Sequence, residues 1–344
     1  MLVESTAGGT VVRGAATRLR DTLPGLGAAL VVAGVATAAG AEVPVVGGPV
    51  FGIVLGVLVA SVLAPGDRWR PGLAVASRPV LQTSIVVLGA TLSLGRVVSV
   101  GVSSLPVMLG TLAVALGGAW LLGRWLRVEG TTTLLIGVGT AICGASAIAA
   151  TQSVVRARDS TVAYAVGTIF VFNVVAVLAF PPLGHLLGLD PHAFGLWAGT
   201  AINDTSSVVA AGYAYGGDAG PYSIVVKLTR SLMIIPVVLV LVSWTARHDG
   251  ARERVSWFRL VPPFLVGFVL ASVLTTVGVV PQAWHPALTA LGTFLITTAL
   301  AGIGLSMRVA DLRRTGGRPL LLGASLWVLV GASSLAIQAL TGTV

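Results

Sequence analysis

Apolar stretches of membrane-spanning length recur along the whole chain and constrain its fold more than any other feature. A bilayer core about 30 Å thick is crossed by roughly 20 apolar residues of helix. The fold is therefore predicted to be an all-α polytopic membrane protein, with residues 1–22 as a cytoplasmic segment and residues 23–344 as a single transmembrane transporter domain. Eleven hydrophobic segments are expected, at approximately 23–40, 44–64, 76–95, 101–123, 131–155, 160–187, 192–216, 220–246, 259–280, 284–307 and 317–341.

Charged residues are too scarce to cover the surface of a soluble protein. Only 10% of the residues are charged and the mean hydropathy is +0.96, whereas a soluble domain has roughly 25% charged residues. This excludes a soluble enzyme, and it removes the argument for a nucleic-acid partner that the net charge of +9 would otherwise make. The single cysteine, Cys143, excludes an intramolecular disulfide and a multi-cysteine metal site.

The positions of the basic residues predict the orientation in the membrane, because Lys and Arg gather in cytoplasmic loops. If the segments simply alternate, and Lys227 and Arg230 are left aside because they lie inside a segment, 16 basic residues lie on the side of the amino terminus. The other 3, Arg96, Arg156 and Arg158, lie on the opposite side. We therefore expect a multi-pass protein of the inner (plasma) membrane, with a cytoplasmic amino terminus and an outside carboxyl terminus. Arg78, just before Pro79, is expected to be a cytoplasmic anchor at the start of the third segment.

Two of the three exceptions suggest a departure from simple alternation. If segments 131–155 and 192–216 were re-entrant, each entering and leaving on one face, Arg156 and Arg158 would move to the cytoplasmic side. The count would then be 18 to 1. Broken helices that cross the membrane are the alternative.

The same two segments share an internal repeat. Gly139–Ser146 aligns without gaps on Gly199–Ser206, 60 residues later, with Gly, Thr, Ala, Ile and Ser matching. Such weakly helical stretches can break a helix, and broken backbone within a membrane must be buried in protein or line a cavity. Secondary transporters bind substrate at half-helices of this kind; the alternative is that the small residues only allow close helix packing. The predicted substrate-binding residues of the two motifs are Gly139, Thr140, Cys143, Gly144, Ser146, Asn203, Thr205 and Ser206.

Three ionisable residues fall within apolar segments, where charges are costly and usually functional. Asp204 is predicted to carry a proton, bind a coupling cation or pair with a buried base; a purely structural ion pair is the alternative. Lys227 and Arg230 lie three residues apart and so share a helix face. They are predicted to contribute to binding an oxyanion, unless both extend to the membrane interface. Asn173 and Gln338 are expected to hydrogen bond between helices.

Three of these stretches carry a resemblance to a known family. GVGTAICGASAIAA (137–150), AINDTSSVVAAGYAYG (201–216) and VKLTRSLMIIPVVL (226–239), together with IGLSM (303–307), resemble the YeiH family of bacterial membrane proteins, which are commonly labelled sulfate exporters. The likeness covers most of the chain from about residue 45. That family is similar in architecture to the cation/proton antiporter and bile-acid symporter superfamily, which implies inverted repeats and discontinuous helices beside a panel domain.

The chain departs from that family at one position. The residue before the Asp-Thr pair is commonly His in the family and is Asn203 here. This puts proton coupling through this position in doubt, because a neutral amide suits cation coordination or substrate hydrogen bonding.

These features together predict a secondary active transporter of a small anion of the sulfate, sulfite or sulfonate class, coupled to a cation through Asp204. A cation/proton antiporter using Asp204, in which Lys227 pairs with the empty carboxylate, and a passive anion uniporter or channel are the alternatives. No enzymatic activity and no resident metal or cofactor are expected, although Na⁺ or H⁺ is the expected coupling ion. The expected partners are the anionic substrate and the lipid bilayer, with no nucleic acid; a homodimer is left open.

Overall fold

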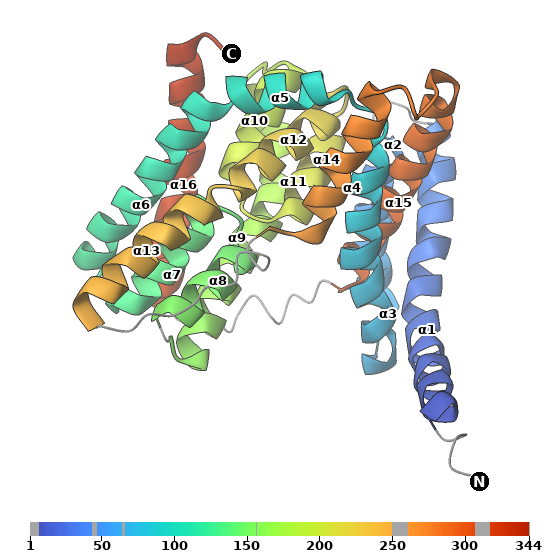
Figure 1. Cartoon of the computed structure of the whole chain (residues 1–344), viewed down its shortest axis with the longest axis horizontal. Helices are drawn as coiled ribbons and strands as arrows, with labels where there is room; N and C mark the ends of the chain where they lie inside the picture. The colour runs from blue at the N-terminus through green and yellow to red at the C-terminus, as the bar shows by residue number, and fades with distance from the viewer. Residues whose placement is uncertain are drawn as a thin grey trace. The chain divides into compact units, whose positions relative to one another are not determined.

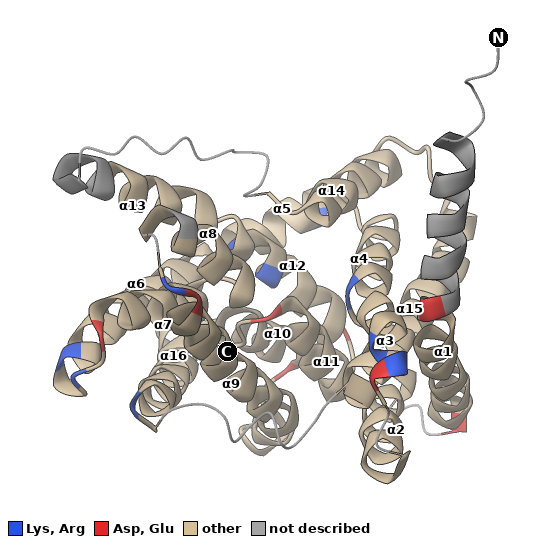
Figure 2. Ribbon diagram, turned by 90° about the horizontal axis from the view of Figure 1, so that it is seen from below, with Lys and Arg blue, Asp and Glu red and all other residues tan. Residues whose placement is uncertain are grey.

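The chain is helical throughout the part that can be described (Figure 1). The computed structural model describes residues 7–42, 47–63, 66–155, 157–249, 261–306 and 317–343. These residues form two compact units, one of Met1–Val87 with Pro286–Arg308 and the other of Leu88–His285 with Val309–Val344. The predicted all-α polytopic class is confirmed, since the described helices carry few charged residues (Figure 2).

The first unit consists of long apolar helices packed closely through glycine. A Cβ at Gly52 would lie 2.9 Å from the Thr297 carbonyl oxygen, and one at Gly56 would lie 2.7 Å from that of Ala301. Only glycine therefore allows the two helix backbones to approach this closely. The elements of this unit are α1 (Ala7–Glu42), α2 (Gly47–Leu63), η1 (Asp67–Trp69), α3 (Arg70–Val75), η2 (Ala76–Val80), α4 (Leu81–Gly89) and α15 (His285–Ser306), the last two each crossing a unit boundary.

The second unit contains both predicted broken segments. Its buried core is rich in aromatic side chains: the Phe180 and Trp197 rings stack 4.1 Å apart, and the Trp197 indole donates a hydrogen bond to the Gly331 carbonyl at 3.0 Å. The elements are α5 (Leu94–Ser103), α6 (Leu105–Trp125), α7 (Gly130–Ala141), α8 (Ala145–Val155), α9 (Asp159–Leu186), α10 (Pro191–Ala201), α11 (Thr205–Tyr215), α12 (Ala219–Ser231), α13 (Ile234–Asp249), α14 (Pro263–Thr276), η4 (Gln282–Trp284) and α16 (Gly317–Thr341).

The expected count of eleven segments is not confirmed within the described part of the chain. Among the described residues, 7 helical runs are long and apolar enough to cross, and α2, α5 and α14 are shorter apolar helices. Segments 131–155 and 192–216 are each divided into two helices of 11 or 12 residues. The 7 long runs are Asp21–Glu42, Asp67–Gly89, Leu105–Trp125, Asp159–Leu186, Ala219–Ser243, Gln282–Ser306 and Gly317–Thr341.

Candidate functional site

The first broken segment, α7–α8, is interrupted at the first copy of the internal repeat. Helix α7 ends at Ala141, and the break spans Ile142–Gly144 before α8 begins at Ala145. Gly144 has φ of +65°, a left-handed conformation that glycine adopts without steric cost. The glycine of the motif is therefore what lets the chain turn here.

The second broken segment, α10–α11, is interrupted at the second copy. Helix α10 ends at Ala201, Ile202 is extended, and α11 begins at Thr205. Asp204 caps α11 by accepting a hydrogen bond from the Ser207 backbone N–H at 3.2 Å, and it also accepts one from the Ser206 hydroxyl. An N-terminal cap of this type begins a new helix where the previous one has ended.

The α7–α8 segment enters and leaves at the same place. Glu129, just before α7, forms an ion pair with Arg158, just after α8, with 3.1 Å between the carboxylate oxygen and the guanidinium nitrogen. A segment that crossed a bilayer core about 30 Å thick could not bring its two flanking residues into contact. We call α7–α8 the first hairpin.

The α10–α11 segment also returns to its starting point. The Tyr215 hydroxyl, at the end of α11, donates a hydrogen bond to the Leu189 carbonyl just before α10. The Tyr215 ring also stacks on His185, with 4.1 Å between ring centroids, near the end of α9. We call α10–α11 the second hairpin. Because the first hairpin ends where α9 begins and the second begins where α9 ends, the two enter from opposite ends of α9.

The breaks of the two hairpins lie against each other. A Cβ at Gly144 would be 3.7 Å from the Cβ of Asn203. The Asn173 side chain on α9 fixes the second break, since its amide oxygen accepts hydrogen bonds from the backbone N–H groups of Asn203, at 3.2 Å, and Asp204, at 3.3 Å. The expectation that Asn173 forms hydrogen bonds to another segment is thus confirmed.

Lys227 joins the two breaks. Its ammonium group donates one hydrogen bond to the Ile142 carbonyl and one to the Ile202 carbonyl, both at 2.9 Å. Ile142 and Ile202 are equivalent positions of the internal repeat. One cation on α12 therefore donates to the equivalent carbonyl of each hairpin. Each of these carbonyls lies just after a helix end, where it has no partner within its own helix.

Arg230, one turn further along α12, binds the same region. Its guanidinium donates to the carbonyls of Thr140, at 2.7 Å, Ala141, at 2.9 Å, and Ile202, at 3.4 Å. Both Lys227 and Arg230 are 0% exposed. The alternative in which they extend to the membrane interface is therefore wrong.

These contacts place the positive charges at the carboxyl ends of α7 and α10. A helix carries roughly half a negative charge at its carboxyl end and half a positive charge at its amino end. The four helix ends at the breaks thus sum to about zero, two of each sign. With Lys227, Arg230 and Asp204, the site retains about one net positive charge.

The predicted residues of the two motifs separate into a packed group and an accessible group. Gly139 serves packing, because a Cβ there would lie 3.0 Å from the Ile148 side chain. Thr140 is buried and contributes its carbonyl to Arg230. Gly144 and Asn203 are buried at the breaks. The accessible group consists of Ser146, which is exposed, and of four half-buried residues, Cys143, Asp204, Thr205 and Ser206.

Other polar groups of the site have roles that residue type alone did not indicate. The Thr200 hydroxyl shares a hydrogen bond of 2.7 Å with the Ser334 hydroxyl on α16. Among the described residues, Gln338 donates to Ser334 on its own helix, at 3.2 Å, and not directly to another helix as expected. The Asn203 side-chain oxygen is buried without a hydrogen-bond partner among the described residues. Thr200 could have been found by its match to Thr140 in the repeat.

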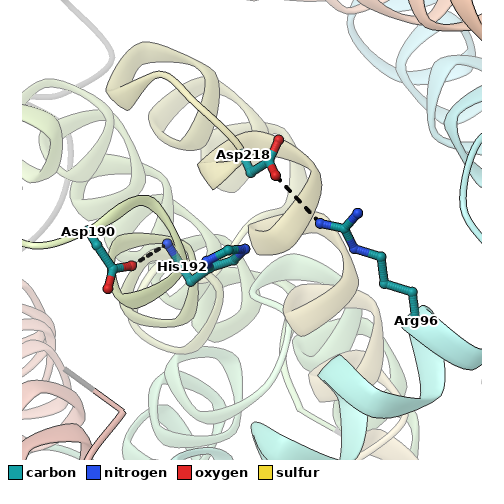
Figure 3. Close-up of polar contacts among 4 residues, drawn as sticks. All are labelled: Arg96, Asp190, His192 and Asp218. Carbon is teal, nitrogen blue, oxygen red and sulfur yellow. Dashed lines mark hydrogen bonds and ion pairs between the residues drawn. The ribbon is translucent and has the colours of Figure 1, made fainter.

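Polar contacts also surround the base of the second hairpin (Figure 3). Asp190 caps α10 by accepting from the His192 backbone N–H at 2.7 Å. Arg96 on α5 forms an ion pair of 3.5 Å with Asp218, which precedes α12. Arg96 was the remaining exception to the expected distribution of basic residues, and this partner offsets its charge.

Comparison with known proteins identifies the family. The family model described as conserved hypothetical protein 698 matches residues 24–323. The UPF0324 membrane protein spyM18_1033 of Streptococcus pyogenes serotype M18 is 44% identical over 335 residues, covering 94% of this chain and 98% of the relative. The UPF0324 membrane protein FN0533 of Fusobacterium nucleatum is 38% identical over 319 residues, covering 87% of this chain and 92% of the relative. No solved structure matches the chain. The chain therefore belongs to the conserved hypothetical protein 698 family, that of the UPF0324 membrane proteins.

Proposed function

We propose that this protein is a secondary active transporter of a small anion of the sulfate, sulfite or sulfonate class, coupled to a cation and working by alternating access. The observation that carries the proposal is the pair of hairpins that enter from opposite ends of α9 and meet at their breaks. Half-helices that meet within the membrane are the binding sites of many secondary transporters. The resemblance to proteins labelled sulfate exporters supports the anion class.

The net charge near the breaks favours an anion as substrate. The site carries about one positive charge, because the helix ends cancel and two cations oppose one carboxylate. Lys227 and Arg230 attract the anion through their charge and not by direct hydrogen bonds, because their N–H groups already donate to backbone carbonyls. We place the anion at the amino end of α8, where Ser146 is exposed and the first-turn N–H groups can donate.

The amino end of α11 is suited to a cation instead. It is already capped by the Asp204 carboxylate, which repels an anion. Asp204 is half-buried, and next to it in sequence lies the Asn203 amide oxygen, which has no hydrogen-bond partner among the described residues. A monovalent cation bound at Asp204 would raise the net charge of the site from about +1 to about +2, which suits a dianion such as sulfate.

The cation/proton antiporter is less well supported. In that mechanism Lys227 pairs with Asp204 when the ion has left. Within the described part of the chain Lys227 forms no ion pair with Asp204, and its ammonium group donates to two carbonyls.

Flux measurements in proteoliposomes test the proposal. The purified protein is reconstituted, and uptake of radiolabelled sulfate, sulfite and taurine is followed with and without an imposed pH or sodium gradient. We expect at least one anion to accumulate only when a gradient is present. Empty liposomes prepared in parallel give the background. Absence of gradient-dependent uptake for all three anions would refute the proposal.

A further inference from the structure

Arg78 in the first unit lies at an unexpected place in its helical run. The expected role was a cytoplasmic anchor at the start of a segment, but the apolar helical run begins at Asp67 and ends at Gly89. Arg78 lies eleven residues from each of these ends, or about 16 Å at the helical rise of 1.5 Å per residue. The segment does not begin beside Arg78 as expected, because the helix starts earlier and continues through Pro79.

The helix continues because it widens at this point. Residues Ala76–Val80 form a π-helical turn that contains Arg78 and Pro79. The Thr83 hydroxyl donates to the Pro79 carbonyl at 2.9 Å, and the Ser77 hydroxyl donates to the Ala74 carbonyl at 3.4 Å. Of these two, the Ser77 bond reaches a carbonyl upstream of Pro79, on the side where the missing proline N–H leaves an acceptor free. Single π turns within helices are common at functional sites.

The guanidinium of Arg78 has no partner in the part of the chain that the structure describes. Arg78 is exposed, and no described residue forms an ion pair or a side-chain hydrogen bond with it. Gln82, one turn further along, is exposed as well, as is Thr83. Residues four apart share a helix face. A helical run of membrane-spanning length therefore presents an arginine and an amide together.

Lipid is an unsuitable environment for this face. A cation near the bilayer centre is found where it meets water, a counter-charge or backbone carbonyls. We propose that Arg78 and Gln82 form an anion-binding position on a water-filled pathway in the membrane. This inference rests on the proposed function and specifies a further contact of its substrate. The guanidinium offers a planar pair of donors to an oxyanion, and the Gln82 amide adds another donor.

Transport by variants of Arg78 tests the role of the charge. We expect Arg78→Gln to raise the KM for anion uptake at least about tenfold, and Arg78→Lys to raise it less, because Lys keeps the charge but not the paired donors. Arg70→Gln is the matched control, because Arg70 is an exposed arginine on the same run that pairs with Asp67 at 3.0 Å. Wild-type KM in Arg78→Gln would overturn the inference. Size-exclusion profiles check that each variant is folded.

Chemical labelling gives a second readout that does not require transport. Gln82→Cys in membranes is treated with the charged, membrane-impermeant reagent MTSES, and mass spectrometry of peptides separates its labelling from that of Cys143. Leu58→Cys is the control, because Leu58 is an exposed apolar residue on α2. We expect Gln82→Cys to react, sulfate to slow the reaction, and Arg78→Gln to abolish this protection. Gln82→Cys as unreactive as Leu58→Cys, or reactive without sulfate protection, would overturn the inference.

The two tests distinguish this inference from the proposed function. If the wild-type protein accumulates no anion while sulfate protects Gln82→Cys in an Arg78-dependent manner, the transport proposal fails and the binding position stands. If the wild-type protein transports an anion and Arg78→Gln does so equally well, the binding position fails and the transport proposal stands.

Discussion

At the scale of single residues, the charges that the membrane should exclude have backbone partners. Lys227 and Arg230 are fully buried and donate to the carbonyls where α7 and α10 end. Buried charges are tolerated when they are hydrogen bonded. The two cations thus offset the cost of breaking two helices, and the broken helices in turn supply the acceptors that the cations need.

Removing the Lys227 ammonium should therefore destabilise the protein. Lys227→Met keeps a similar length of side chain but leaves the Ile142 and Ile202 carbonyls without this donor. We expect the free energy of unfolding to fall by about 3 kcal/mol, seen as a lower Tm in detergent. Arg96→Met is the control, because the Arg96–Asp218 pair is exposed and contributes about 1 kcal/mol or less. A Tm of Lys227→Met equal to that of the control would contradict this role.

At the scale of elements, the two hairpins define the topology around α9. The ion pair between Glu129 and Arg158 closes the first hairpin, and the bond from Tyr215 to the Leu189 carbonyl closes the second. With both hairpins re-entrant, Arg158 joins the side on which most basic residues are expected. The distribution of charge and the geometry of the hairpins therefore support the same topology.

Sided labelling of introduced cysteines tests that topology. Glu129→Cys and Arg158→Cys should react with an impermeant maleimide from one side of the membrane. Leu187→Cys and Asp218→Cys, which flank the second hairpin, should react from the other. Right-side-out and inverted vesicles provide the two sides, and peptide mass spectrometry separates these sites from Cys143. Labelling of Glu129→Cys and Arg158→Cys from opposite sides would show that α7–α8 crosses the membrane.

The sequence predicted the breaks better than it predicted their partners. The matching motifs located both interruptions, because glycine and small polar residues weaken a helix wherever they occur. The acceptors of Lys227 could not be predicted, because a main-chain carbonyl has no residue type to mark it. The start of the third segment was misplaced because Pro79 indicates a helix end, whereas the helix continues through Pro79 with a π turn at Ala76–Val80.

At the scale of the whole molecule, the chain divides its polar features between two compact units. The hairpins, the two buried cations and Asp204 all belong to the second unit. Arg78 belongs to the first. In the alternating access that we propose, the two hairpins move against the remaining helices, and the hydrogen bonds of Lys227 keep the two breaks together during the movement.

The central claim is that Asp204 couples a cation to anion transport at the breaks, and Asp204→Asn tests it most directly. Asn also caps helices well, so α11 should still begin at Thr205. Asp218→Asn, an exposed carboxylate outside the hairpins, is the control. The measurement compares exchange of radiolabelled sulfate, sulfite or taurine with its gradient-driven accumulation in proteoliposomes. The account predicts that Asp204→Asn retains exchange and loses accumulation, whereas the control keeps both. Retention of accumulation, or loss of exchange together with accumulation in a folded Asp204→Asn protein, would contradict it.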